Sequence, residues 1–159
     1  MTRAYLAFTE KGLALAQKLA SALPGTVARC GHGGPGLADW AAEQFAHADA
    51  LIFVGAVGIA VRAIAPHCRS KAVDPAVVVL DECGHFAVPI LSGHLGGAND
   101  LARALAAVCG AVPVITTATD ANGVFAVDAW ARHQNCAVLE PGRIKRVSSR
   151  LLAGGPVRY

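Results

Sequence analysis

Charged side chains are scarce in this chain. Asp, Glu, Lys and Arg make up 16% of its 159 residues, against about 25% in an average globular protein. Hydrophobic residues reach 54%, so a large core can form and intrinsic disorder is excluded. A surface with so few charges also suggests that another domain, a partner or a bulky ligand covers part of it.

Aromatic residues and runs of basic residues are scarce as well. Aromatics are 6%, and Lys and Arg cluster only at Arg143, Lys145 and Arg146. A nucleic-acid interface needs a concentrated basic face interleaved with aromatics, so no nucleic-acid partner is expected. The mild net charge of +3 fits a small polyanionic ligand better.

Long hydrophobic runs and paired cysteines are missing too. The longest apolar run, 51–61, is far shorter than the roughly 20 residues of a membrane helix, and the N-terminus lacks a secretory signal. We therefore expect no membrane contact and a cytoplasmic protein. The five cysteines form no CxxC pair. The Cys–Gly–His tripeptides at 30–32 and 83–85 lack zinc-ligand spacing, so free thiols and no metal site are expected.

Apolar strands alternate with amphipathic helices along the first two thirds of the chain. The predicted strands are 4–8, 26–29, 50–54, 76–80, 86–91 and 112–116, and the predicted helices are 11–22, 37–46, 57–65, 99–108 and 127–133. This alternation predicts an α/β fold with a mostly parallel sheet flanked by helices, in a Rossmann-like three-layer arrangement. The short turn at 81–85 allows a hairpin over 76–91.

A domain boundary is expected near residues 120–123, where the pattern becomes more polar. This divides the chain into an α/β domain at 1–122 and the beginning of a further region at 123–159. The last residues carry no helix or strand stop signal, which is typical of a truncated chain.

Ligands of open α/β sheets bind beyond the carboxyl ends of the strands, and three segments are expected to converge there. In the first, Gly55 and Gly58 follow a buried strand and open a helix whose N–H groups could face an anion. Arg62 could add a guanidinium fork for a carboxylate. A tight turn with a surface arginine is the alternative interpretation.

The second segment combines a histidine with small residues. A histidine side chain ordinarily titrates near neutrality, so His94 is a candidate general base or acid. Gly96 and Gly97 leave it uncovered and offer N–H groups, while Asn99 suits a helix cap. Ser92 lacks the nucleophile-elbow context, so we expect it to bind rather than attack. A purely structural histidine is the alternative.

The third segment supplies hydroxyls and a carboxylate. Thr117 and Asp120 could hydrogen-bond a polar ligand, although Asp120 could equally cap a helix. Asp81 and Glu82 follow another strand on alternating sides, so they are no ready-made carboxylate pair. Glu82 is the one expected to reach the crevice, unless the turn is simply solvated.

Four motifs in order resemble the CbiG family of cobalamin (vitamin B12) biosynthesis. They are GAVGIAVRAIA at 55–65, KAVDPAVVVLDE at 71–82, LSGHLGGAN at 91–99 and VITTATD at 114–120. The resemblance is dense over about 50–120 and looser on both sides. The first 48 residues look like the family's N-terminal region, and those after 125 like the start of its middle region.

The resemblance implies a cobalt-precorrin-5A hydrolase. In that reaction water opens a δ-lactone and a two-carbon unit leaves as acetaldehyde, with cleavage of a carbon–carbon bond. Cobalt would arrive inside the tetrapyrrole substrate, so no cofactor of the protein is expected. Family members commonly continue into a further C-terminal domain, and pathway enzymes or a homo-oligomer are further candidate partners.

Residue chemistry then suggests roles for the three segments in such a reaction. The catalytic candidates are His94, Asp120 and Glu82, and the substrate-binding candidates are Gly55, Gly58, Arg62, Ser92, Gly96, Gly97, Asn99 and Thr117. Two other functions stay open. One is a non-catalytic module that binds the corrinoid intermediate, and the other is a generic nucleotide-binding domain, against which the missing P-loop argues.

Overall fold

The structure is a computed structural model that describes residues 1–157. The chain forms two compact units, Met1–Val114 and a second that begins at Ile115. This boundary lies before the one predicted from the sequence, which follows residue 122. Within the described residues, no helix is long and apolar enough to cross a membrane.

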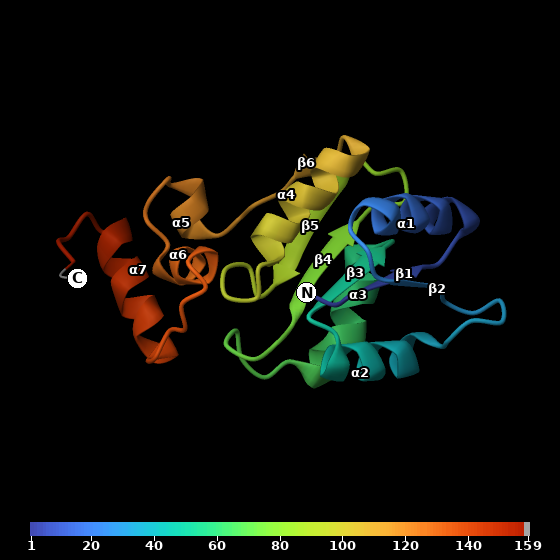
Figure 1. The fold of residues 1–159 in the computed structure, drawn as a ribbon, viewed down its shortest axis with the longest axis horizontal. Coiled ribbons are helices and arrows are strands. Elements are labelled where there is room, and N and C mark those ends of the chain that lie inside the picture. Colours follow the sequence, from blue (N-terminus) through green and yellow to red (C-terminus); the bar gives the residue numbers. More distant parts are fainter. Residues whose placement is uncertain (158–159) are drawn as a thin grey trace. The chain divides into compact units, whose positions relative to one another are not determined.

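The first unit alternates strands and helices around one sheet (Figure 1). Its elements are β1 (Arg3–Ala7), α1 (Glu10–Ala22), β2 (Thr26–Arg29), α2 (Leu37–His47), β3 (Ala50–Val54), α3 (Val57–Ile64), the 3₁₀ turn η1 (Ala65–His67), β4 (Ala76–Leu80), β5 (Phe86–Leu91), α4 (Ala98–Cys109) and β6 (Val112–Pro113). The strand order is β2-β1-β3-β4-β5-β6. The first four strands are parallel. β5 runs antiparallel to β4, and β6 is parallel to β5. The predicted mostly parallel sheet and the hairpin over 76–91 are confirmed.

Helices cover both faces of this sheet, with α1 and α4 on one side and α2 and α3 on the other (Figure 1). Every residue of β3 and β4 is buried, which explains their uniformly apolar sequences. On the α2–α3 side, Trp40 packs edge-on against Phe53 with ring centroids 5.3 Å apart. The predicted three-layer α/β architecture is therefore confirmed.

The first strand–helix unit shows how local chemistry sets the element ends. Thr9 caps α1 as predicted, because its hydroxyl accepts the Gly12 N–H at 3.0 Å. On the adjacent strand, fully buried Tyr5 donates its hydroxyl to the carbonyl of Leu23 at 2.6 Å, just after α1 ends. This bond joins the carboxyl end of α1 to the sheet.

Two sequence predictions in this unit are wrong. The strand predicted at 112–116 is only two residues long and Val112 is 56% exposed. β6 lies at the sheet edge beside β5 alone, so it is not a core strand. Asn99 does not cap α4, because the helix begins one residue earlier and Gly97, at φ 83°, takes the cap position.

The loop from β5 to α4 is packed around its glycines. A Cβ on Gly93 would lie 2.9 Å from the Asn99 side chain, and a Cβ on Gly96 would lie 2.4 Å from the Ser92 Cβ and 2.8 Å from the Ser92 carbonyl oxygen. The glycines therefore make room for neighbouring residues of the same loop.

The second unit is helical in its described part. Its elements are α5 (Ala118–Ala121), α6 (Val127–His133), the 3₁₀ turn η2 (Pro141–Arg143) and α7 (Ile144–Leu152). The helix predicted at 127–133 is confirmed. α7 was not predicted from the sequence, and five of its nine residues are polar or basic.

Replacing Gly96 by alanine should destabilise the first unit. The added methyl would overlap atoms close to the backbone of Ser92, so the loop must move, at a cost of about 1–3 kcal/mol. The matched change Gly58→Ala adds a methyl that meets nothing within 4 Å on a helix and should stabilise by up to about 1 kcal/mol. Urea unfolding of both variants measures the difference, and equal stabilities would contradict the packing role.

The stability of the fold should decrease in alkaline solution partly because of Tyr5. Burial raises the pKa of Tyr5 above its ordinary value near 10. As pH rises, the Tyr5 hydroxyl therefore loses its proton in the unfolded chain before it does so in the folded chain. The contribution of Tyr5 to the free energy of unfolding is lost as pH rises from about 10 through the folded-state pKa. Urea unfolding at about pH 9 and about pH 11 should show a smaller decrease for Tyr5→Phe than for the unchanged chain. Identical decreases would refute this assignment.

Candidate functional site

A pocket of about 340 Å³ lies at the carboxyl edge of the parallel strands. The loops that follow β1, β3 and β4 line it, since parallel strands end at the same edge of a sheet. Its lining residues are Phe8, Thr9, Gly55, Ala56, Ile59, Asp81 and Glu82. Two residues singled out from the sequence, Gly55 and Glu82, therefore meet in one place.

Glu82 is held in this pocket by Thr9. The Thr9 hydroxyl donates to Glu82 Oε2 at 2.5 Å while it accepts the N–H of Gly12. Within residues 1–157 the other carboxylate oxygen, Oε1, accepts no hydrogen bond. The result is an oriented carboxylate at the N-terminus of α1, where the helix dipole favours negative charge.

Lys11 adds a positive charge close to the same carboxylate. Its ammonium donates to the Cys83 thiol at 3.1 Å. This hydrogen bond and the charges of Cys83, Glu82 and Asp81 raise the pKa of Lys11. The amine therefore stays protonated beside the pocket at neutral pH.

Asp81 stabilises the backbone of the turn that follows β4 and, like its neighbour Glu82, lines the pocket. Its carboxylate accepts the N–H groups of Cys83, His85 and Phe86 at 3.2, 2.9 and 2.8 Å. These bonds build the turn between β4 and β5. This turn also positions Glu82 so that it lines the pocket.

The two glycines after β3 differ in whether their backbone is available to a ligand. The Gly55 N–H donates to the Leu80 carbonyl at 2.8 Å, so it is no oxyanion donor, and a Cβ there would meet the Phe8 ring at 2.8 Å. Gly58 is exposed in the first turn of α3, which has no side-chain cap. Arg62 is exposed one turn further along and does not line the pocket.

The second predicted segment lies at the opposite edge of the sheet. β5 is antiparallel to β4, and Leu91 pairs with Val77 near the start of β4. The segment 92–97 therefore follows β5 away from the carboxyl edge. The prediction that it converges with Gly55 and Glu82 is wrong, because a hairpin reverses the direction in which its second strand ends.

Within that segment several candidate groups serve the loop itself. Ser92 is buried and donates its hydroxyl to the Asp74 carbonyl at 3.0 Å. The Gly97 N–H donates to the His94 carbonyl at 3.0 Å, and Asn99 is buried. His94 is half-buried, so the surrounding glycines do not leave it fully open.

The third segment belongs to the second unit. Thr117 donates its hydroxyl to Asp120 Oδ2 at 2.6 Å across the first turn of α5. Thr117, rather than Asp120, occupies the cap position. The two predicted residues thus interact with each other.

A resident metal would need several ligating side chains in one place. Among residues 1–157, no group of three or more His, Cys, Asp or Glu could hold a metal ion. All five cysteines are free thiols.

Sequence reasoning missed Thr9 and Phe8 as pocket residues. Thr9 was identified only as a helix cap, although its position at the end of a parallel strand also places it at the ligand-binding edge. The signal was therefore present, and combining the two inferences would have found the residue.

Comparison with known proteins gives one consistent family. The sequence pattern described as cobalamin synthesis G N-terminal matches residues 39–120. The cobalt-precorrin-5A hydrolase of Salmonella typhimurium is 47% identical over 144 residues, which cover 83% of this chain and 40% of that protein. The protein of the same name from Priestia megaterium is 48% identical over 82 residues, or 52% of this chain and 22% of that one.

A solved structure shares the fold. A chain described as a cobalamin biosynthesis protein G homologue from Sulfolobus solfataricus superposes with a TM-score of 0.62 at 24% identity, and the match covers 96% of this chain and 46% of that one. This chain thus spans less than half the length of the relatives it matches. Because the family pattern extends over more than half of its residues, the chain belongs to the cobalamin synthesis G N-terminal family.

Proposed function

We propose that this chain takes part in the hydrolysis of cobalt-precorrin-5A, in which water opens a δ-lactone and acetaldehyde is released. The 47% identity with the Salmonella typhimurium enzyme over 83% of this chain supports the proposal most strongly. The family pattern at 39–120 includes the pocket residues Gly55 and Glu82.

The proposed reaction requires a base for water or for the freed hydroxyl, and donors for the developing oxyanion. We place the base at Glu82, whose Oε1 is open while Thr9 orients the carboxylate through Oε2. The uncapped first turn of α3, at Gly58, offers backbone N–H groups to an oxyanion. Arg62 would anchor a peripheral carboxylate of the substrate.

Other residues have supporting or alternative roles in this proposal. His94, at the opposite edge of the sheet, is the alternative base. For Asp120 and Thr117, which belong to the second unit, contact with polar groups of the substrate stays a proposed role. Gly96 contributes to the shape of the loop that presents His94.

The proposed substrate brings its own metal. Cobalt would enter inside the tetrapyrrole, and no cofactor of the protein would take part. We place the reaction in the cytoplasm. The longer relatives suggest that a further C-terminal domain, in the same or another chain, acts together with this one.

Release of acetaldehyde tests the proposed reaction directly. The 159-residue chain is incubated with cobalt-precorrin-5A, and acetaldehyde is measured by coupling to alcohol dehydrogenase and NADH. We expect acetaldehyde to form above the level without protein. Tight binding of the intermediate without acetaldehyde would overturn the enzyme proposal for this chain and favour the non-catalytic corrinoid-binding module.

The base assignment is tested by matched substitutions. Glu82→Gln keeps the size of the side chain but removes its basicity, so the turnover number should fall about 10²–10⁴-fold. Glu43→Gln, on an exposed face of α2, should leave it unchanged. Loss of turnover in His94→Ala, with full turnover in Glu82→Gln, would instead place the base at the opposite edge of the sheet.

A further inference from the structure

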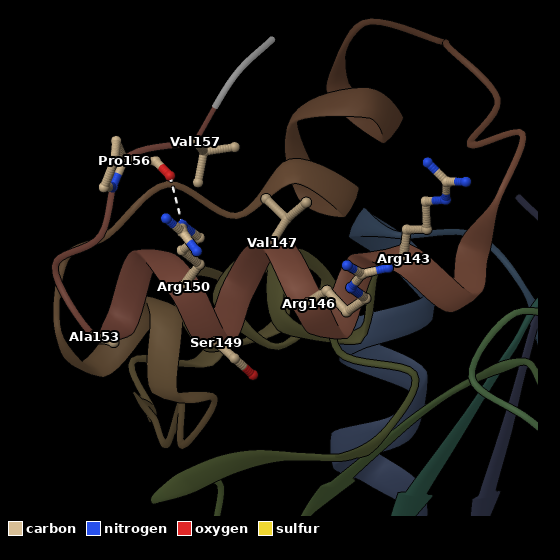
Figure 2. A pocket seen from close by; sticks show the side chains of 8 residues that line it. All are labelled: Arg143, Arg146, Val147, Ser149, Arg150, Ala153, Pro156 and Val157. Carbon is tan, nitrogen blue, oxygen red and sulfur yellow. Dashed lines mark hydrogen bonds between the residues drawn. The ribbon is translucent and has the colours of Figure 1, made fainter.

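The second unit contains a large concave surface along α7. The described residues that line this cavity of about 950 Å³ all lie between 143 and 157, and we call it the α7 groove. Arg143, Arg146 and Arg150 line it at helical spacings of three and four residues, which brings them to one side of the helix. Figure 2 shows Val147 among these arginines.

The charge of the α7 groove is largely unneutralised. The helix itself, Ile144–Leu152, contains three basic residues and no acidic one. Arg143 pairs through Nε with Glu140 Oε2 at 2.5 Å, and Arg150 donates Nε–H to the Pro156 carbonyl at 2.7 Å. Arg146 has no hydrogen-bond or ion-pair partner within residues 1–157. Most of the guanidinium donors are therefore available to an anion.

A turn of the chain gives the groove an apolar wall. Gly154 adopts φ 75°, and the N–H of Gly155 donates to the Arg150 carbonyl at 2.9 Å. The chain then returns alongside the helix, so Pro156 and Val157 lie on the side of Val147 (Figure 2). The surface is thus concave and combines arginines with aliphatic side chains.

We propose that the α7 groove binds a ligand that carries several carboxylates on an apolar frame. The identification of this ligand with the macrocyclic substrate rests on the proposed function. Arg143 and Arg150 are seven positions apart, which corresponds to a helical rise of roughly 10 Å. A single carboxylate cannot reach all three arginines, whereas carboxylates spread around a macrocycle can. Each guanidinium fork fits one carboxylate.

The composition of the groove favours such a ligand over a nucleic acid. Single-stranded nucleic acids are held by aromatic side chains that stack on their bases, and none of the described residues that line this groove is aromatic. Its aliphatic residues instead suit the apolar body of a ring. The volume also falls in the range of roughly 300–1,000 Å³ that is usual for small-molecule sites.

The test uses uroporphyrin, a porphyrin with eight carboxylates, and the 159-residue chain. Its dissociation constant is measured from the change in porphyrin fluorescence at about 0.1 M salt. Arg146→Gln removes the guanidinium that has no partner, and we expect the dissociation constant to rise about tenfold. Lys145→Gln removes one positive charge at the preceding position, which does not line the groove. This change should alter the dissociation constant less than about twofold.

Several outcomes would overturn the proposal. Equal increases of the dissociation constant in the two variants would show that binding depends only on the net charge of the chain. Equal affinity for a porphyrin without carboxylates would show that the arginines are irrelevant, and displacement of uroporphyrin by oligothymidine at lower concentration would identify a nucleic-acid site. Circular dichroism of both variants confirms that α7 is retained.

The test is separable from that of the proposed hydrolase. Porphyrin binding that depends on Arg146 but comes without acetaldehyde release supports the α7 groove and contradicts the hydrolase. Acetaldehyde release with equal porphyrin affinity in both variants supports the hydrolase and contradicts the groove.

Discussion

The direction of β5 decides which residues of the first unit can act together. β1 to β4 all end at one edge, but the turn fixed by Asp81 sends β5 back antiparallel to β4. The loop 92–97 that follows β5, including His94, therefore lies at the other edge of the sheet. A parallel fifth strand would have placed His94 beside Glu82. The hydrogen bonds of one carboxylate in the five-residue turn 81–85 thus determine the layout of the candidate chemistry.

Most of the fold could be predicted from the sequence because local signals agreed with the tertiary structure. β3 and β4 are uniformly apolar since both faces are covered, and Thr9 stands where a cap is needed. β6 could not be predicted at its true length, because Val112–Thr116 has the composition of a core strand and only its place at the sheet edge shortens it. α7 was missed because its side chains are mostly polar and basic.

The candidate site was less predictable than the fold for a physical reason. A motif such as LSGHLGGAN suggests an open catalytic loop, yet Gly93 and Gly96 are small because Asn99 and Ser92 occupy the space beside them. Sequence cannot distinguish a glycine that admits a ligand from one that admits a neighbouring residue. The expected hairpin already implied the reversal of β5, so the separation of His94 from Glu82 could have been foreseen.

The bond between Thr9 and Glu82 joins residues 73 positions apart in the chain. It can form only after β1, β3 and β4 have paired, because each of these strands carries one wall of the pocket. Closing so long a loop is a late and entropically costly event in folding. A partly folded chain therefore has no oriented carboxylate, and the pocket is complete only once the first unit has folded.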